Sequence, residues 1–144
     1  MKITLEPANL QETEVIIKGD VSSAEVAALL QMLGKKNSGK LILFKEDEQF
    51  VVDTTEIVFA ETCGNKVSVY TQNDVFEAKQ KLYELMETLE AFSFAQINKS
   101  TIVNIDSVKS IQAEFSGNYC IKLKNRKEVL TVSRNYFKKF KESI

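Results

Sequence analysis

The chain of 144 residues contains no histidine, which removes imidazole catalysis, the commonest zinc ligand and the usual charge switch near neutral pH. One proline and five glycines argue against disorder and against a long linker. The two cysteines, Cys63 and Cys120, are far apart in unrelated surroundings, which excludes the spacing of a thiol redox motif or a zinc motif. We expect each to be a small, half-buried apolar residue.

Long apolar runs are also missing. No uncharged run approaches the length of a membrane span, and the first residues place an acid and a proline where a signal peptide needs an apolar stretch. These features predict a soluble, cytoplasmic protein. The sequence has no glycine-rich phosphate loop, nucleophile elbow, metal-ligand cluster or catalytic carboxylate pair. We therefore expect no enzymatic activity, no cofactor, no metal and no small-molecule substrate.

The net charge of −1 conceals an uneven distribution of charge along the chain. Residues 41–97 carry four basic and eleven acidic side chains, whereas residues 98–144 carry ten basic and four acidic ones. This asymmetry permits a basic face on a protein with an acidic isoelectric point. An apolar content of 44% in a chain of this length predicts one good core, in a single domain with an appendage.

Residues 1–38 predict a small β-β-α extension. Lys2–Leu5 and Glu14–Lys18 have the pattern of short strands. A helix follows, in which Ser22 and Glu25 form a capping box and Gly34 ends the element. Four apolar residues recur at helical spacing and predict a packing surface: Val26, Leu29, Leu30 and Leu33.

Residues 41–144 predict a mainly β, α+β domain of antiparallel strands with short helices. The polar stretch 35–39 is the expected domain boundary. Short β-prone runs separated by polar turns are typical of antiparallel meanders. An amphipathic helix is predicted at 79–90, and another begins after Ser133. The expected strands are Leu41–Phe44, Gln49–Val52, Ile57–Glu61, Lys66–Thr71, Val75–Ala78, Val108–Phe115, Tyr119–Leu123 and Val129–Val132.

The stretch Phe94–Ile105 places three hydrogen-bonding residues between two short apolar runs. Asn98, Lys99 and Ser100 offer an amide, an ammonium and a hydroxyl, and the apolar flanks should hold them rigidly. Turn chemistry alone also explains an asparagine and a serine at these positions. The local sequence leaves two interpretations open, a solvated turn and a rigid contact loop.

Two further segments offer similar side chains. The turn at 63–66 can project Asn65 and Lys66 beyond the strand ends, because glycine and asparagine tolerate positive φ. Arg134 and Asn135 begin the last helix, where free backbone N–H groups attract anions. Arginine and lysine pair with guanine and asparagine with adenine, so these segments offer side chains that suit base edges. Phosphate contacts would come from Ser100, Lys122, Lys127, Lys138 and Lys139.

Three motifs follow one another in residues 41–144. The first is Ile57-Val58-Phe59-Ala60-Glu61 with Gly64-Asn65-Lys66-Val67, the second Phe94 with Lys99-Ser100-Thr101-Ile102-Val103-Asn104-Ile105, and the third Val132-Ser133-Arg134-Asn135-Tyr136-Phe137. Their order resembles the LytTR-type DNA-binding domain of bacterial transcription regulators. The resemblance implies an elongated, mainly antiparallel β fold that reads DNA from loops and not from a recognition helix. The DNA contacts that it implies are Asn65, Lys66, Val67, Lys99 and Arg134, with Asn98, Ser100 and Asn135 as secondary contacts. Lys138 is added to the predicted DNA-binding residues as one of the phosphate contacts named above.

The sequence departs from the family's pattern in two respects. Members with histidines carry them where this chain has Val67 and Asn98, so its base preference should differ. The best-known members also carry a phospho-receiver domain, for which residues 1–40 are too short. Conventional two-component phosphorylation is therefore not expected on this chain.

The leading interpretation is a stand-alone, sequence-specific bacterial transcription regulator that binds double-stranded DNA as a homodimer or on two repeated half-sites. Residues 1–38 would serve packing, dimerisation or regulator binding, and the resemblance implies a membrane-protein regulator as a partner. The alternative is a protein-interaction module that uses the apolar face of the N-terminal helix and does not read DNA. A basic surface shared by the three loops favours DNA reading, and a neutral or acidic one favours the interaction module.

Overall fold

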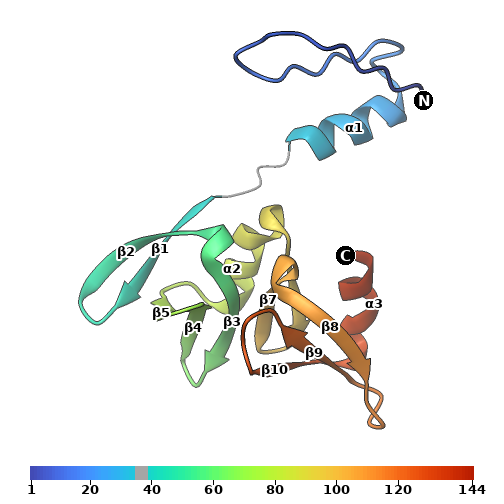
Figure 1. Ribbon diagram of the computed structural model, residues 1–144. Helices are drawn as coiled ribbons and strands as arrows, with labels where there is room; N and C mark the ends of the chain where they lie inside the picture. The colour runs from blue at the N-terminus through green and yellow to red at the C-terminus, as the bar shows by residue number, and fades with distance from the viewer. Residues whose placement is uncertain (35–38) are drawn as a thin grey trace. The chain divides into compact units, whose positions relative to one another are not determined.

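The computed structural model describes residues 1–34 and 39–144, and the chain divides into two units, Met1–Lys35 and Lys36–Ile144 (Figure 1). Within its described residues, the first unit contains one helix, α1 (Ala24–Gly34), and otherwise irregular backbone. The second unit, over the part that is described, contains two antiparallel sheets and two α-helices. No helix in the described ranges is long and apolar enough to cross a membrane.

The first unit forms the predicted helix but not the predicted strands. Lys2–Leu5 and Glu14–Lys18 have no regular secondary structure, so the expected β-β-α extension is wrong in its two strands. An isolated pair of short strands is at best marginally stable in water, because further strands or a helix must cover its apolar face. Side chains in both segments are largely exposed, with Leu5 at 88% and Ile16 at 69%.

Helix α1 is capped one residue later than predicted. Ser23 is the N-cap, since its Oγ accepts a hydrogen bond from the N–H of Val26 at 3.2 Å. Ser22 instead donates two hydrogen bonds to Asp20 Oδ1, from its N–H and from its hydroxyl. These bonds lower the pKa of the Asp20 carboxyl, the hydroxyl bond more than the N–H bond. The predicted capping box of Ser22 and Glu25 is therefore wrong.

The apolar stripe of α1 is only partly buried. Val26 is 8% exposed, whereas Leu30 and Leu33 are 57% and 56% exposed. Leu29 is half-buried. The helix thus keeps an apolar face that is exposed to solvent.

The second unit follows the predicted alternation of short strands and polar turns. Every strand expected in residues 41–144 is present, and its bounds differ from the prediction by two residues at most. The helix predicted at 79–90 begins only at Leu82. Lys81 is its N-cap residue, and the N–H of Lys81 donates a hydrogen bond to Glu84 Oε1 at 3.2 Å. In order, the elements are β1 (Lys40–Lys45), β2 (Glu48–Asp53), η1 (Thr54–Glu56), β3 (Ile57–Cys63), β4 (Lys66–Thr71), β5 (Val75–Ala78), α2 (Leu82–Leu89), η2 (Glu90–Phe92), β6 (Phe94–Asn98), β7 (Thr101–Asn104), η3 (Ile105–Ser107), β8 (Val108–Ala113), β9 (Tyr119–Leu123), β10 (Val129–Val132) and α3 (Arg134–Glu142).

The strands of the second unit pair as antiparallel neighbours in two sheets. The large sheet has the order β2-β1-β5-β4-β3-β7-β6, and the small sheet has the order β10-β9-β8. β6 and β7 pair with Phe94 opposite Asn104, so the Phe94–Ile105 stretch contains a hairpin. The predicted fold class, mainly antiparallel β with short helices, is confirmed by this arrangement.

The large sheet has a core on each of its faces. Consecutive residues of β7 point into different cores, because side chains alternate along a strand. Ile102 packs with Leu85 of α2 in one core, and Val103 packs with Phe140 of α3 and the small sheet in the other. We call them the α2 core and the α3 core. Strands buried on both faces cannot shift register without exposing apolar residues, so the turns at their ends are held in fixed positions.

Candidate nucleic-acid interface

The β3–β4 turn and the β6–β7 turn lie at the same end of the large sheet. β3 and β7 are neighbours, with Glu61 opposite Thr101. The N–H of Thr62 donates to the carbonyl oxygen of Ser100 at 2.9 Å and ties the end of β3 to the second turn. Since neighbouring strands lie about 4.8 Å apart, the centres of the two turns are about 10 Å from each other. The first two predicted DNA-contact segments are therefore adjacent.

Asn98 fixes the second of these turns. Its Nδ2 donates to the carbonyl oxygen of Thr131 in β10 at 2.8 Å, and its Oδ1 accepts from the N–H of Ser100 at 2.8 Å. Both polar ends of the amide thus bind the protein itself. Lys99, between the two anchored residues, is exposed. Asn98 therefore builds the turn, and the turn presents Lys99 to solvent.

The start of α3 lies beside the same turn. The N–H of Ser133 donates to the carbonyl oxygen of Ile97 at 2.9 Å. Ser133 is the N-cap by position, as predicted, but its side chain makes no capping hydrogen bond. The N–H of Arg134 donates instead to Oδ1 of Asn118, in the β8–β9 loop, at 3.1 Å. The third predicted segment thus joins the other two, and a residue of a fourth segment caps its helix.

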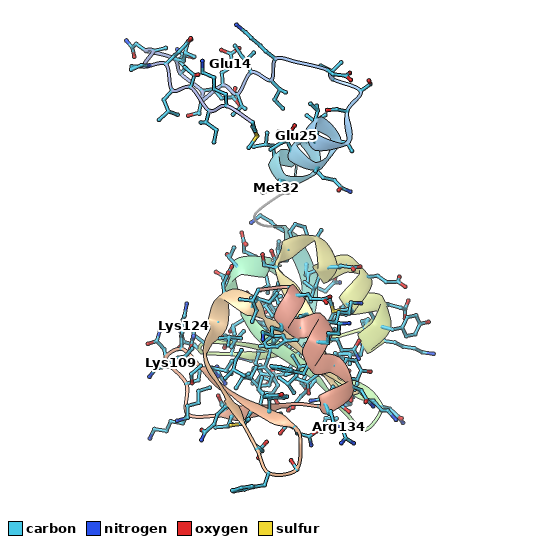
Figure 2. All side chains as sticks on the ribbon, turned by 90° about the vertical axis from the view of Figure 1, so that its right-hand side faces the viewer. Glu14, Glu25, Met32, Lys109, Lys124 and Arg134 are labelled. Atoms are coloured by element: carbon cyan, nitrogen blue, oxygen red, sulfur yellow. The ribbon has the colours of Figure 1, made fainter. Side chains whose placement is uncertain are left out.

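We call the surface made by the exposed residues of these three segments the contact edge. In Figure 1 the β3–β4 turn, β10 and the β8–β9 hairpin lie along the lower side of the second unit, and Figure 2 shows Arg134 at the lower end of α3. Lys138 is one helical turn after Arg134 and lies on the same side of α3. The members of the contact edge are Asn65, Lys66, Lys99, Ser100, Arg134, Asn135 and Lys138, all exposed.

The contact edge is basic. Within residues 1–34 and 39–144, the ion pairs are Lys40–Asp53, Lys45–Asp74 and Arg126–Glu128, so the cations of the contact edge are not among them. Cations without an internal partner are free to neutralise phosphates. A basic surface shared by the three loops is the outcome that favours DNA reading over the interaction module. The four cations concerned are Lys66, Lys99, Arg134 and Lys138.

The carboxylate of Glu61 in β3, close in sequence to the β3–β4 turn, is hydrogen-bonded to Tyr70. Glu61 is half-buried, and its Oε1 accepts a hydrogen bond from the hydroxyl of Tyr70 at 3.1 Å. Burial raises the pKa of Tyr70, and the hydrogen bond to Glu61 raises it further. The phenol therefore remains protonated at neutral pH and keeps donating to the carboxylate.

Two predictions for this surface are wrong. Val67, expected to contact DNA, is 5% exposed and belongs to the α2 core. Its side chain points opposite to that of Lys66, because neighbouring residues of a strand face opposite sides. Cys63, expected to be half-buried, is exposed at the end of β3, whereas Cys120 is half-buried as predicted.

Sequence reasoning did not identify the residue that joins the two sheets at the β9–β10 turn. Arg126 donates from a terminal nitrogen to the carbonyl oxygen of Thr71 at 2.7 Å. Its guanidinium also binds both carboxylate oxygens of Glu128 and lies 5.7 Å from the ring centroid of Phe59. The hydrogen bond from Arg126 lowers the pKa of the Glu128 carboxyl. The contact edge combines two turns of the large sheet with the start of α3, which directly follows β10 of the small sheet, so this clamp helps to hold its parts together.

Over the described residues, a β domain that presents exposed cations and amides from two turns and from the start of one helix has the features of a nucleic-acid-binding protein. The comparison with known families agrees with this class. The chain belongs to the LytTr DNA-binding domain family, whose sequence model matches residues 47–144.

The chain is also similar to individual proteins of known name. It is 34% identical over 102 residues to sensory transduction protein LytT of Oceanobacillus iheyensis, an alignment that covers 69% of this chain and 42% of that protein. It is 23% identical over 133 residues to transcriptional regulatory protein YpdB of Escherichia coli, covering 92% of this chain and 53% of that protein. The chain thus spans about half the length of these relatives.

A solved structure supports the fold. The LytTr DNA-binding domain of a methyl-accepting/DNA response regulator from Bacillus cereus superposes with a TM-score of 0.67 at 23% identity. The superposition covers 72% of this chain and 94% of that domain. The arrangement of strands in the second unit is therefore the one found in this family.

Proposed function

We propose that this protein is a sequence-specific transcription regulator that binds double-stranded DNA with the contact edge. The observation that carries the proposal is that three segments distant in sequence meet at one end of the sheets and present four exposed cations. The relatives named as a sensory transduction protein and a transcriptional regulatory protein support the same role. A bacterial regulator of transcription works in the cytoplasm, where we place this protein.

We assign separate tasks to the residues of the contact edge. Arg134 and Lys99 read base edges, since a guanidinium matches the two acceptors of guanine and an ammonium binds the same atoms. Asn65 adds an amide that suits adenine. The remaining side chains bind phosphates and set the position of the domain on the duplex, and they are Lys66, Ser100, Asn135 and Lys138.

Replacing Lys99 and Arg134 by alanine, one at a time, tests this assignment. The probe is a duplex that the wild-type protein selects from a randomised library. Each variant should bind this duplex more weakly by about 1–3 kcal/mol and with relaxed preference at one base position. The free energy of unfolding should be unchanged, because both side chains are exposed. Lys109→Ala is the matched control, since Lys109 is exposed on β8 and Figure 2 shows it well away from Arg134. Wild-type affinity in both contact-edge variants would contradict the proposal.

We further propose that residues 1–34 join two copies of the chain. Leu30, Met32 and Leu33 of α1 are 57%, 71% and 56% exposed, and a segment this short does not bury enough surface to be stable alone. Pairing of α1 with its counterpart would cover these side chains and place two contact edges on two half-sites.

Sedimentation of the purified chain tests this part of the proposal. The wild type should sediment as a dimer, Leu33→Glu as a monomer, and the neighbouring Gln31→Glu as a dimer. A wild-type chain that stays monomeric would favour a different partner for α1, for which the family resemblance implies a membrane-protein regulator.

A further inference from the structure

The most exposed large apolar side chain of the described residues is Phe115, at 113% of its reference accessibility. It lies in the β8–β9 hairpin, which extends from the small sheet with residues 109–116 all exposed. A single exposed apolar residue is common on protein surfaces and needs no explanation by itself. Phe115 differs from such a residue because the tip of its hairpin contacts Arg134 of the contact edge.

The tip of this hairpin is held in one conformation. The N–H of Gly117 donates to the carbonyl oxygen of Glu114 at 3.1 Å. The N–H of Glu114 donates to the carbonyl oxygen of Asn118 at 2.9 Å. Gly117 has φ of +90°, a conformation that favours glycine. The hydroxyl of Ser116 also accepts from the N–H of Asn118 at 3.3 Å. A turn closed by these bonds presents Phe115 without a large loss of chain entropy on binding.

The same tip is joined to Arg134 of the contact edge. Asn118 Oδ1 accepts the first N–H of α3, and a β-carbon placed on Gly117 would lie 3.6 Å from the guanidinium of Arg134. Phe115 is two residues from Gly117, which limits their backbone separation to about 7 Å. In Figure 2 the hairpin ends beside the labelled Arg134. A duplex bound by Arg134 therefore comes within reach of the ring of Phe115.

We propose that the tip of the β8–β9 hairpin, residues 114–118, is a fourth DNA-contact segment, in which Phe115 packs on an apolar surface of the duplex next to the base pair bound by Arg134. The inference rests on the proposed function and extends it to a residue outside the three family motifs. Duplex DNA offers a phenyl ring two apolar surfaces, the methyl group of thymine in the major groove and the stacked faces of a base step that it wedges apart. Phe115 thereby adds a preference that charged side chains cannot supply.

The experiment uses the whole 144-residue chain and the duplex that the wild type selects from a randomised library. Phe115→Ala should bind this duplex about tenfold more weakly, the size expected for losing the contact of one aromatic ring, and Phe115→Leu should bind with intermediate affinity. The matched control is Tyr83→Ala, which removes an aromatic ring that is 61% exposed on α2, outside the contact edge, and should leave affinity unchanged. Hydroxyl-radical footprints should lose protection on one side of the Arg134 contact in Phe115→Ala only.

Two further measurements identify the apolar surface. If the ring packs on thymine, replacing the flanking thymines with deoxyuridine weakens the wild type and has no effect on Phe115→Ala. If the ring wedges a base step, the wild type bends the duplex in a fluorescence-transfer assay and Phe115→Ala does not, whichever pyrimidine is present.

Wild-type affinity and an unchanged footprint in Phe115→Ala would overturn the inference and leave the proposed function standing. A change in self-association without a change in DNA affinity would also overturn it, because Phe115 would then contact protein. If the wild type selects no duplex at all, the proposed function fails and the inference fails with it.

Discussion

Replacing Asn98 by alanine shows which of two roles this residue has, holding the turn of the contact edge in place or contacting DNA directly. The amide makes two intramolecular hydrogen bonds, each of 2.8 Å, to Thr131 and Ser100. A hydrogen bond contributes a net 0.5–1.5 kcal/mol or so, and water can partly replace both bonds at a half-buried site, so we expect Asn98→Ala to lower the free energy of unfolding by about 1–2 kcal/mol. Asn98→Asp keeps the acceptor for Ser100 but sets a carboxylate oxygen against the carbonyl oxygen of Thr131, so its loss should be at least as large.

Urea denaturation followed by DNA binding checks both halves of the reasoning. Asn98→Ala should weaken binding to the selected duplex together with the loss of stability, because the turn that carries Lys99 is loosened. The matched control is Asn65→Ala, which removes an exposed amide of the neighbouring turn and should change DNA affinity without changing the free energy of unfolding. Wild-type stability in Asn98→Ala, with relaxed preference at one base pair, would refute the positioning role and make Asn98 a direct contact.

Three other measurements test the electrostatics of the structure. Arg126→Met should lower the free energy of unfolding by about 2–4 kcal/mol, because it removes a bound cation that is 12% exposed. The control Lys127→Met should change it by less than about 0.5 kcal/mol. Equal effects of the two substitutions would exclude a stabilising role for the Arg126 contacts. Since the folded pKa of Glu128 is lowered, its contribution should be present above the pKa of an unfolded glutamate and be lost as pH falls through the folded value. Glu128 is about half exposed, so acid titration of Glu128→Gln against the wild type should show a difference below about 1 kcal/mol. Lys138→Ala should reduce the slope of log K against log salt by about 1, and an unchanged slope would remove Lys138 from the interface.

The elements of the second unit follow from local sequence, because alternating apolar residues and polar turns define each strand without reference to its partner. The predicted strands at Lys2–Leu5 and Glu14–Lys18 show the limit of that reasoning. Their composition suits a strand, but a strand also needs a neighbour that covers its apolar face, and the sequence pattern contains no information about that neighbour.

The candidate site was predictable in its residue types and not in its geometry. Lys66, Lys99 and Arg134 carry chemistry that suits DNA wherever they lie, but their meeting at one edge depends on the pairing of β3 with β7 and on contacts between the sheets. The capping of α3 by Asn118 was missed for the same reason, since the two residues are 16 positions apart. Val67 was mistaken for a contact because a motif match does not show on which face of a strand a side chain lies.

Each of the three segments of the contact edge is flanked in the sequence by at least one buried residue. Lys66 precedes Val67, Asn98 to Ser100 lie between Ile97 and Thr101, and Arg134 follows Val132 by two residues; these four flanking residues are 0–6% exposed. Substitutions at the exposed positions therefore leave the cores untouched, and those at the flanks do not. A lineage of such proteins can change its target sequences through single substitutions at full stability, so binding preferences should diverge among relatives faster than their folds.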